Sequence, residues 1–267
     1  MPSTSFRPSP ARVLARSLAS SLTPSLVGRD PQTRWRPGLA SQPFHSEIFA
    51  SANEASGAGL ALALARDAFT SSNEGEAAND IRQVLWVQDR KAIQLGGRPC
   101  FSGLPPDWRH RLIHVAAATP EDALFALEEG VRCRDLACVI GEIAGNPRAL
   151  TFTTSRRLSL TAERNGVRLW LVRLDAEPDL SSARMRWRVA AAPSPSPRWN
   201  AAAPGTATWH AELFRARAHA PGEWMLSDDN AALAIRRDTE AERAATPDHV
   251  RLAPPTVGRS LAARVRA

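Results

Sequence analysis

The strongest constraint on the fold of this chain is a series of short apolar runs in its central part. Four runs of four to eight residues follow a fifth short segment at 46–50. The four are Val84–Val87, Leu112–Val115, Leu136–Ile143 and Val167–Leu174. Runs of this length are typical of strands that are buried on both faces. The longest charge-free apolar stretch, Ala55–Ala65, is shorter than the ~18 residues that a membrane span needs, so we expect no membrane association.

Helical segments lie between these runs. Leu60–Phe69 is rich in Ala and Leu, and Ser155–Asn165 ends at Gly166, a residue suited to a helix C-terminus. Thr119 followed by Pro120 and two acids is a helix-start signal. Strands that alternate with helices favour a parallel sheet with crossover helices. We therefore predict an α/β fold with a mostly parallel sheet flanked by helices.

The pattern changes towards the C-terminus. Residues 184–190 and 209–217 resemble two strands, and the loop between them is rich in Pro, Ala and Ser. These segments predict a C-terminal antiparallel strand pair. The formal charge of +7 is concentrated at the ends, since residues 1–41 contain six arginines and one acid. We expect a basic, disordered tail at 1–41, a folded domain at 42–230 and a basic, flexible tail at 231–267.

The composition excludes several kinds of chemistry. Of the 34 basic residues 33 are Arg, so Lys91 is the only side chain that could serve as a catalytic or phosphate-binding lysine. Three cysteines in 267 residues do not form a disulfide framework, and we expect a cytoplasmic protein. The pairs His110 with His114 and Cys133 with Cys138 lack the spacing of metal-site motifs. We expect no metal, no cofactor and no catalytic residue.

The segment after the first predicted strand has the layout of a phosphate-binding loop. It reads Ser56-Gly57-Ala58-Gly59 before a Leu-Ala-Leu helix. This layout resembles the Walker A region of RecA-type recombinases. Ala58 stands where the lysine would be, and Gly59 where the Mg²⁺-binding Ser or Thr would be. Without these groups we do not expect ATP hydrolysis, although nucleotide binding by backbone amides at the helix N-terminus remains open.

The resemblance to RecA extends to two further strands. Glu142 occupies the position of the Walker B acid, at the end of Val139-Ile140-Gly141-Glu142. Arg90 falls at or next to the position of the catalytic glutamate, with Asp89 as the nearby acid. Glu142 is thus the candidate Walker B-like residue, without a lysine or hydroxyl partner in the loop.

Several stretches together are similar to one family that retains the RecA-like frame. They are His45–Phe49, Leu124–Arg134, Ala137–Glu142, Asn146–Leu150, Thr154–Leu158, Arg186–Val189, Ala190–Ser194 and Trp209–Leu213. Over about 44–226 the chain resembles the ImuA family of SOS-inducible accessory proteins, which is related to the cell-division inhibitor SulA. These stretches consist mainly of small and hydrophobic residues.

The resemblance implies a non-catalytic accessory role in translesion DNA synthesis. The implied partners are an ImuB-like protein and an error-prone replicative-type DNA polymerase. RecA is a further candidate partner, and DNA contact is expected to be weak or indirect. Two alternatives stay open: a divergent P-loop NTPase of DNA repair, using Glu142 and Asp89, or a SulA-like stoichiometric inhibitor of cell division or of a recombinase.

The C-terminal strands contain tryptophans interleaved with arginines. Arg186-Trp187-Arg188 and Trp209, with Arg215 and Arg217, form a candidate nucleic-acid or partner contact, since aromatic and arginine side chains together bind single strands. The alternation around Trp187 equally fits a half-buried strand, with Trp in the core and Arg on the solvent face. We favour this packing interpretation.

Overall fold

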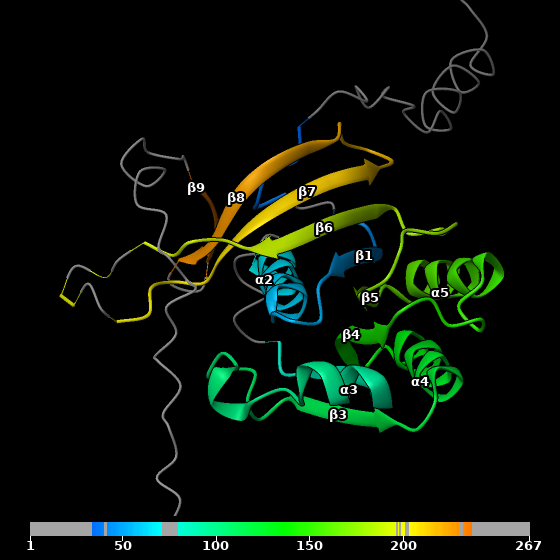
Figure 1. Cartoon of the computed structure of the whole chain (residues 1–267). Helices are drawn as coiled ribbons and strands as arrows, with labels where there is room; N and C mark the ends of the chain where they lie inside the picture. Colours follow the sequence, from blue (N-terminus) through cyan, green and yellow to red (C-terminus); the bar gives the residue numbers. More distant parts are fainter. Residues whose placement is uncertain are drawn as a thin grey trace, which may run out of the picture.

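The fold is built on one mixed sheet of nine strands, seen in a computed structural model (Figure 1). The described residues are 34–39, 42–70, 80–195, 197, 199–200, 203–229 and 232–236. The strand order is β3-β2-β4-β5-β1-β6-β7-β8-β9. Neighbouring strands from β3 to β6 pair in parallel, and β7, β8 and β9 are antiparallel. The predicted α/β class with a mostly parallel sheet is confirmed.

The parallel part of the sheet contains six strands. They are β1 (His45–Ala50), β2 (Gln83–Asp89), β3 (Leu112–Ala117), β4 (Leu136–Ala144), β5 (Arg168–Leu174) and β6 (Met185–Ala191). The antiparallel strands are β7 (Thr208–Ala216), β8 (Gly222–Asp229) and β9 (Ala232–Arg236). The helices are α2 (Ser56–Thr70), α3 (Arg90–Gly96), α4 (Pro120–Arg132) and α5 (Phe152–Asn165), with a 3₁₀ turn, η2 (Phe101–Gly103).

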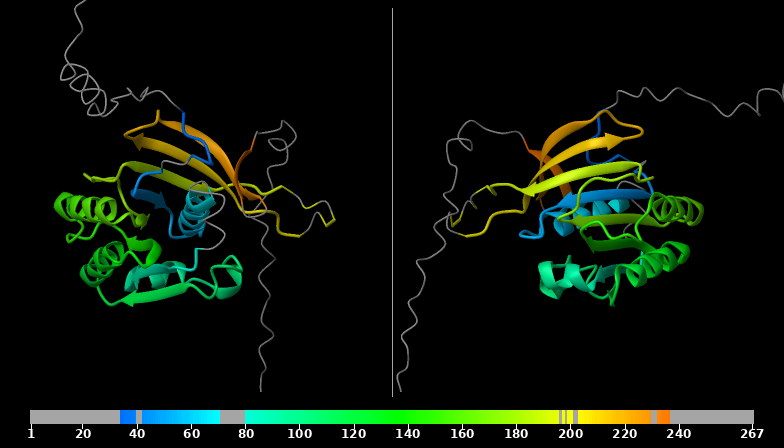
Figure 2. Two further views of the ribbon diagram at one scale, coloured as in Figure 1. Left: turned by 180° about the vertical axis from the view of Figure 1, so that it is seen from behind. Right: turned by 45° about the vertical axis from the view of Figure 1, so that its right-hand side comes forward.

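Helices cover both faces of the parallel strands, as the apolar runs predict. The alternation of side chains along each strand divides the core into two clusters. Leu60 and Leu64 of α2 belong to the cluster that contains Trp86 and Ile140. Helices α4 and α5 lie side by side on the opposite face, in the cluster with Leu85, Val139 and Leu171 (Figure 2).

Local signals explain where the helices begin and end. The Thr119 hydroxyl accepts a hydrogen bond from the Asp122 amide at 3.1 Å, which caps α4 ahead of Pro120. Gly166 has a φ of +73° and ends α5, in the left-handed conformation that glycine adopts without strain. Helix α2 begins at Ser56, four residues before the predicted start, so the loop-like residues 56–59 form its first turn.

Two predictions about the sheet need correction. The run at Leu112–Val115 was expected to be buried on both faces, but β3 is an edge strand and Ile113 is 44% exposed. The C-terminal pair is part of a larger unit, because β6 pairs in parallel with β1 and two further strands follow β7. An apolar run alone does not distinguish an edge strand from a central one.

The folded part extends past the expected 42–230 on both sides. Trp35 is buried, and its ring packs edge-on against Trp187 and Trp224 at centroid distances of 4.7 and 5.4 Å. Strand β9 continues to Arg236. Most of the two expected tails, 1–41 and 231–267, lies outside the described residues. In the described part, none of the helices has both the length and the apolar character needed to cross a bilayer.

Candidate functional site: the loop after the first strand

The predicted phosphate loop lies at the carboxyl edge of the parallel strands, where α/β sheets bind their ligands. It borders a cavity of about 320 Å³. Ala58 and Gly59 of α2, Trp86 and Gln88 of β2, and Glu142 of β4 contribute to the wall. The structure therefore brings together the first turn of α2 and Glu142, the two parts of the site that the sequence predicts.

Gly57 and Gly59 are glycines for packing reasons. A Cβ at Gly57 would lie 2.7 Å from a Val172 methyl carbon and 2.8 Å from the Ala50 Cβ, so a side chain would separate α2 from the sheet. A Cβ at Gly59 would lie 3.0 Å from Cζ2 of Trp209. Trp209 comes from β7 and is 5% exposed. The indole therefore occupies the space beside the position where a Walker loop has its Ser or Thr.

Glu142 is held by two donors inside the protein. Its Oε1 accepts hydrogen bonds from Trp86 Nε1 at 2.6 Å and from Gln88 Nε2 at 3.2 Å. The side chain is 4% exposed, and burial raises the pKa of its carboxyl above the usual value. The Gln88 Oε1 also accepts a hydrogen bond from His114 Nε2 at 2.9 Å. Glu142 is thus part of a polar network that joins β2, β3 and β4.

Asp89, the acid nearest the expected catalytic position, has a structural role. Its Oδ1 accepts a hydrogen bond from the Ala92 amide at 2.6 Å and caps α3. Its Oδ2 accepts from the Ala144 amide at 3.2 Å, which ties β2 to β4. Arg90 is exposed at the start of α3. Among the described residues, no group of three or more His, Cys, Asp or Glu side chains is arranged to hold a metal.

Asp175, which holds the loop from the neighbouring strand, was not predicted from the sequence. Asp175 directly follows β5 and has a φ of +48°, a conformation that Asp tolerates better than most residues. Its Oδ1 accepts a hydrogen bond from the Ala52 amide at 2.9 Å. A carboxylate directly after a buried strand is the only sequence signal that could have identified it.

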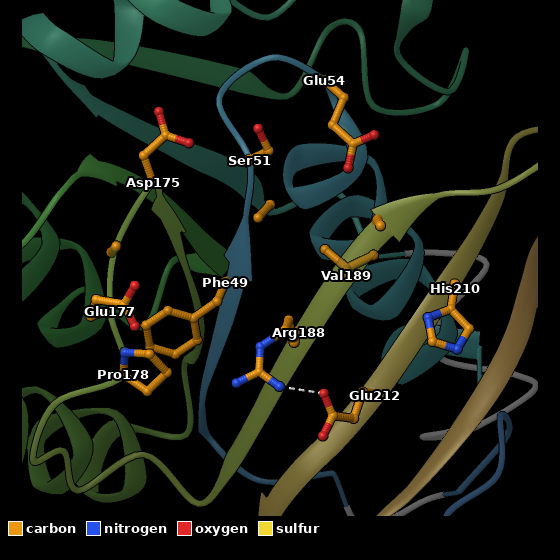
Figure 3. A pocket seen from close by; sticks show the side chains of 13 residues that line it. Phe49, Ser51, Glu54, Asp175, Glu177, Pro178, Arg188, Val189, His210 and Glu212 are labelled. Atoms are coloured by element: carbon orange, nitrogen blue, oxygen red, sulfur yellow. Dashed lines mark hydrogen bonds and ion pairs between the residues drawn. The ribbon is translucent and has the colours of Figure 1, made fainter. Parts of the chain in front are cut away.

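Asp175 also lines a second cavity, of about 610 Å³, shown in Figure 3. Glu54, Glu177 and Glu212 make this cavity acidic. Arg188 points toward Glu212 in Figure 3 and forms an ion pair with it. Glu54 accepts a hydrogen bond from the Ala191 amide at 3.0 Å.

The tryptophans of the predicted contact surface are buried. Trp187 is 1% exposed and Trp209 is 5% exposed, so neither can stack on a base in this structure. This outcome agrees with the packing interpretation and removes both residues from the candidate nucleic-acid contact.

The exposure of the arginines in the predicted contact surface differs from the expectation. Arg186 was placed on the solvent face but is 3% exposed, with its Nε 2.8 Å from a carboxylate oxygen of Glu47. Phe49 and Phe214 pack against its guanidinium. Arg188 is exposed and paired, whereas Arg215 and Arg217 are exposed at the end of β7. Of the predicted set, Arg215 and Arg217 remain accessible to a ligand without a competing partner in the described part.

Comparison with known proteins identifies distant relatives of this chain. No family model matches the chain. It is 32% identical over 158 residues to the curated protein ImuA from two strains of Caulobacter vibrioides. The match covers 55% of this chain and 61% of each relative, so the chain spans less than two thirds of their length. The chain is therefore a distant homologue of ImuA, as its central motifs indicate.

Proposed function

We propose that this chain is a non-catalytic accessory protein of SOS-induced translesion DNA synthesis, with a RecA-like domain that acts through its shape. The distant homology to ImuA supports this role. The proposed partners are an ImuB-like protein and an error-prone replicative-type DNA polymerase in the cytoplasm, with RecA as a further partner.

The observation that carries the proposal is the contact between Trp209 and Gly59. Phosphoryl transfer in P-loop proteins needs a lysine on the phosphates, a hydroxyl on Mg²⁺ and a carboxylate for the metal or the water. Here Ala58 lacks the amine, and the Trp209 ring lies 3.0 Å from where a Cβ at Gly59 would be. Glu142 is hydrogen bonded to Trp86 instead. The loop is thus better suited to packing than to catalysis.

Two measurements on the full chain test the proposal. Phosphate release from ATP with Mg²⁺, with and without single-stranded DNA, should not exceed the buffer rate for the wild type or for Glu142→Gln. In cells that lack the native gene, both proteins should restore damage-induced mutation to the same extent. ATP turnover that disappears in Glu142→Gln, together with loss of mutagenesis, would favour the NTPase alternative.

Binding to the proposed partners is tested directly. The immobilised chain should retain a purified ImuB-like protein, with RecA and the polymerase assayed singly and in combination. The matched control is an immobilised chain unfolded by heat, which has the same charge. Retention of none of the three proteins would remove the scaffold proposal.

A further inference from the structure

A groove of about 600 Å³ lies between α5 and the ends of two strands, away from the loop after β1. One wall is formed by Phe152, Arg156 and Leu160 of α5. The other is formed by the segment 181–184 before β6 and by 215–217 at the end of β7. Figure 1 shows α5 beside the start of β6.

The groove is lined by four arginines and no acid. Arg184 is paired with Glu163 at 2.6 Å. For Arg156, Arg215 and Arg217, the described part of the chain offers no carboxylate within ion-pair distance, and all three are exposed. The cavity of Figure 3 has nearly the same volume but contains four carboxylates. That cavity also contains Arg188 and His210, whereas the groove beside α5 contains arginines and no acid.

A buried network of hydroxyls holds the floor of the groove. The Ser159 and Ser182 oxygens lie 2.6 Å apart, and the Ser155 and Ser181 oxygens 2.8 Å apart. The Ser181 hydroxyl donates to Glu47 at 2.6 Å, which anchors the network in β1. The segment that carries Arg184 is thus fixed against α5, and the arginines are presented by a preformed surface.

An aromatic ring stands beside the arginines. Phe152, Arg156 and Leu160 are spaced four residues apart on α5 and therefore share one face of the helix. Phe152 is 46% exposed and Leu160 is 53% exposed. A cationic groove with an exposed ring is the combination that binds single-stranded nucleic acids: guanidinium groups contact phosphates, and a base stacks on the ring.

We propose that this groove binds a single strand of nucleic acid, with phosphates on Arg156, Arg215 and Arg217 and a base on Phe152. The inference goes beyond the proposed function, since neither the homology nor the loop after β1 uses these residues. It also makes DNA contact direct, where the sequence resemblance implies weak or indirect contact. The test of partner binding and the test of nucleic-acid binding in the groove can therefore fail independently of each other.

The test measures fluorescence anisotropy of a labelled oligo-dT with the full chain over a range of salt concentrations. Arg215→Glu with Arg217→Glu should weaken binding about tenfold and reduce the dependence on salt, because two phosphate contacts are lost. Phe152→Ala should weaken binding at least about fivefold with an unchanged salt dependence. The matched control is Arg90→Glu with Lys91→Glu on α3, which has the same charge change away from the groove and should bind as the wild type.

Three outcomes would overturn the proposal. The groove and control variants could lose affinity equally, which would assign binding to overall charge. Phe152→Ala could bind as the wild type does, which would remove the stacked base. Poly-glutamate could displace the oligo at equal charge concentration, which would identify an acidic peptide as the ligand. Thermal unfolding of each variant verifies the fold, and Arg215→Gln with Arg217→Gln provides a milder pair if the glutamates prevent folding.

Discussion

Glu47 of β1 and Arg186 of β6 form an ion pair of 2.8 Å inside the protein, with side chains that are 1% and 4% exposed. The two residues face each other in register across adjacent parallel strands. Ser181 donates to the same carboxylate, and Phe49 packs on the guanidinium. A charged pair thus connects the strand before the candidate loop with the first of the C-terminal strands.

Replacement of Glu47 by Gln should lower the free energy of unfolding by about 3 kcal/mol, since it leaves the buried Arg186 charge with Asp179, 3.8 Å away, as its counter-charge. Urea unfolding followed by tryptophan fluorescence measures the loss. Glu212→Gln is the control: it breaks the Arg188 pair, which is 54% and 33% exposed, and should cost about 0–1 kcal/mol. Equal losses in both variants would contradict a special role for the buried pair.

Restoring the Walker hydroxyl with Gly59→Thr should destabilise the chain by about 1–3 kcal/mol, because the new side chain meets the Trp209 ring. Trp209→Leu should reduce that penalty, and a double-mutant cycle measures the coupling. Gly96→Ala is the control, since its Cβ would meet nothing within 4 Å and alanine favours a helix. A stabilising effect of Gly59→Thr would show that the indole does not restrict the position.

Much of the fold could be predicted from local patterns. The buried strands were visible as apolar runs, and Thr119 and Gly166 mark helix ends by their own conformational preferences. The edge position of β3 was not predictable in this way, because strand order depends on pairing between distant segments. Strands β8 and β9 were missed because their apolar runs, Trp224–Leu226 and Ala232–Ile235, are short and bordered by charged residues.

The two parts of the candidate site that the sequence predicts lie near each other, but their contacts were not predicted. Ala58 and Gly59 of the predicted loop line the same cavity as Glu142. The partners of Glu142 and the Trp209 contact come from strands far along the chain, and no spacing rule connects them. Arg186 alternates with Trp187 as a solvent-facing residue would, yet Glu47 and two phenylalanines enclose it. Alternation predicts which face a side chain takes, but not whether that face is covered.

Glu142→Gln should make the stability less dependent on pH. The folded carboxyl has a raised pKa, so the unfolded chain releases its proton first, and stability falls as pH rises from the unfolded value of about 4.5 through the folded pKa. Gln retains an oxygen that can accept from Trp86 and Gln88. The difference in stability between the variant and the wild type should therefore shift in favour of the variant from pH 4 to pH 7. Urea unfolding at both pH values measures this difference. A constant difference across this range would contradict the raised pKa.

His45 should make the protein less stable at acidic pH. The ring is fully buried, and its Nδ1 lies 2.7 Å from the Ser159 hydroxyl. Burial is the main cause that lowers its pKa from 6.5 to about 4, and the nearby Arg186 charge adds to this effect. The unfolded chain therefore binds a proton that the folded chain excludes. The contribution of His45 to the free energy of unfolding is fully present above pH 6.5. It falls by about 3 kcal/mol in all as the pH decreases through the folded pKa of about 4.

His45→Asn isolates this contribution, because its amide can replace Nδ1 as the partner of Ser159 and does not titrate. Glu142 titrates in an overlapping range with the opposite sign, but it does so in both proteins and cancels in their difference. The wild type should lose its advantage over His45→Asn between pH 6.5 and 4 in urea unfolding. Parallel stability curves for the two proteins would mean that the buried ring is protonated as easily in the folded chain as in the unfolded one.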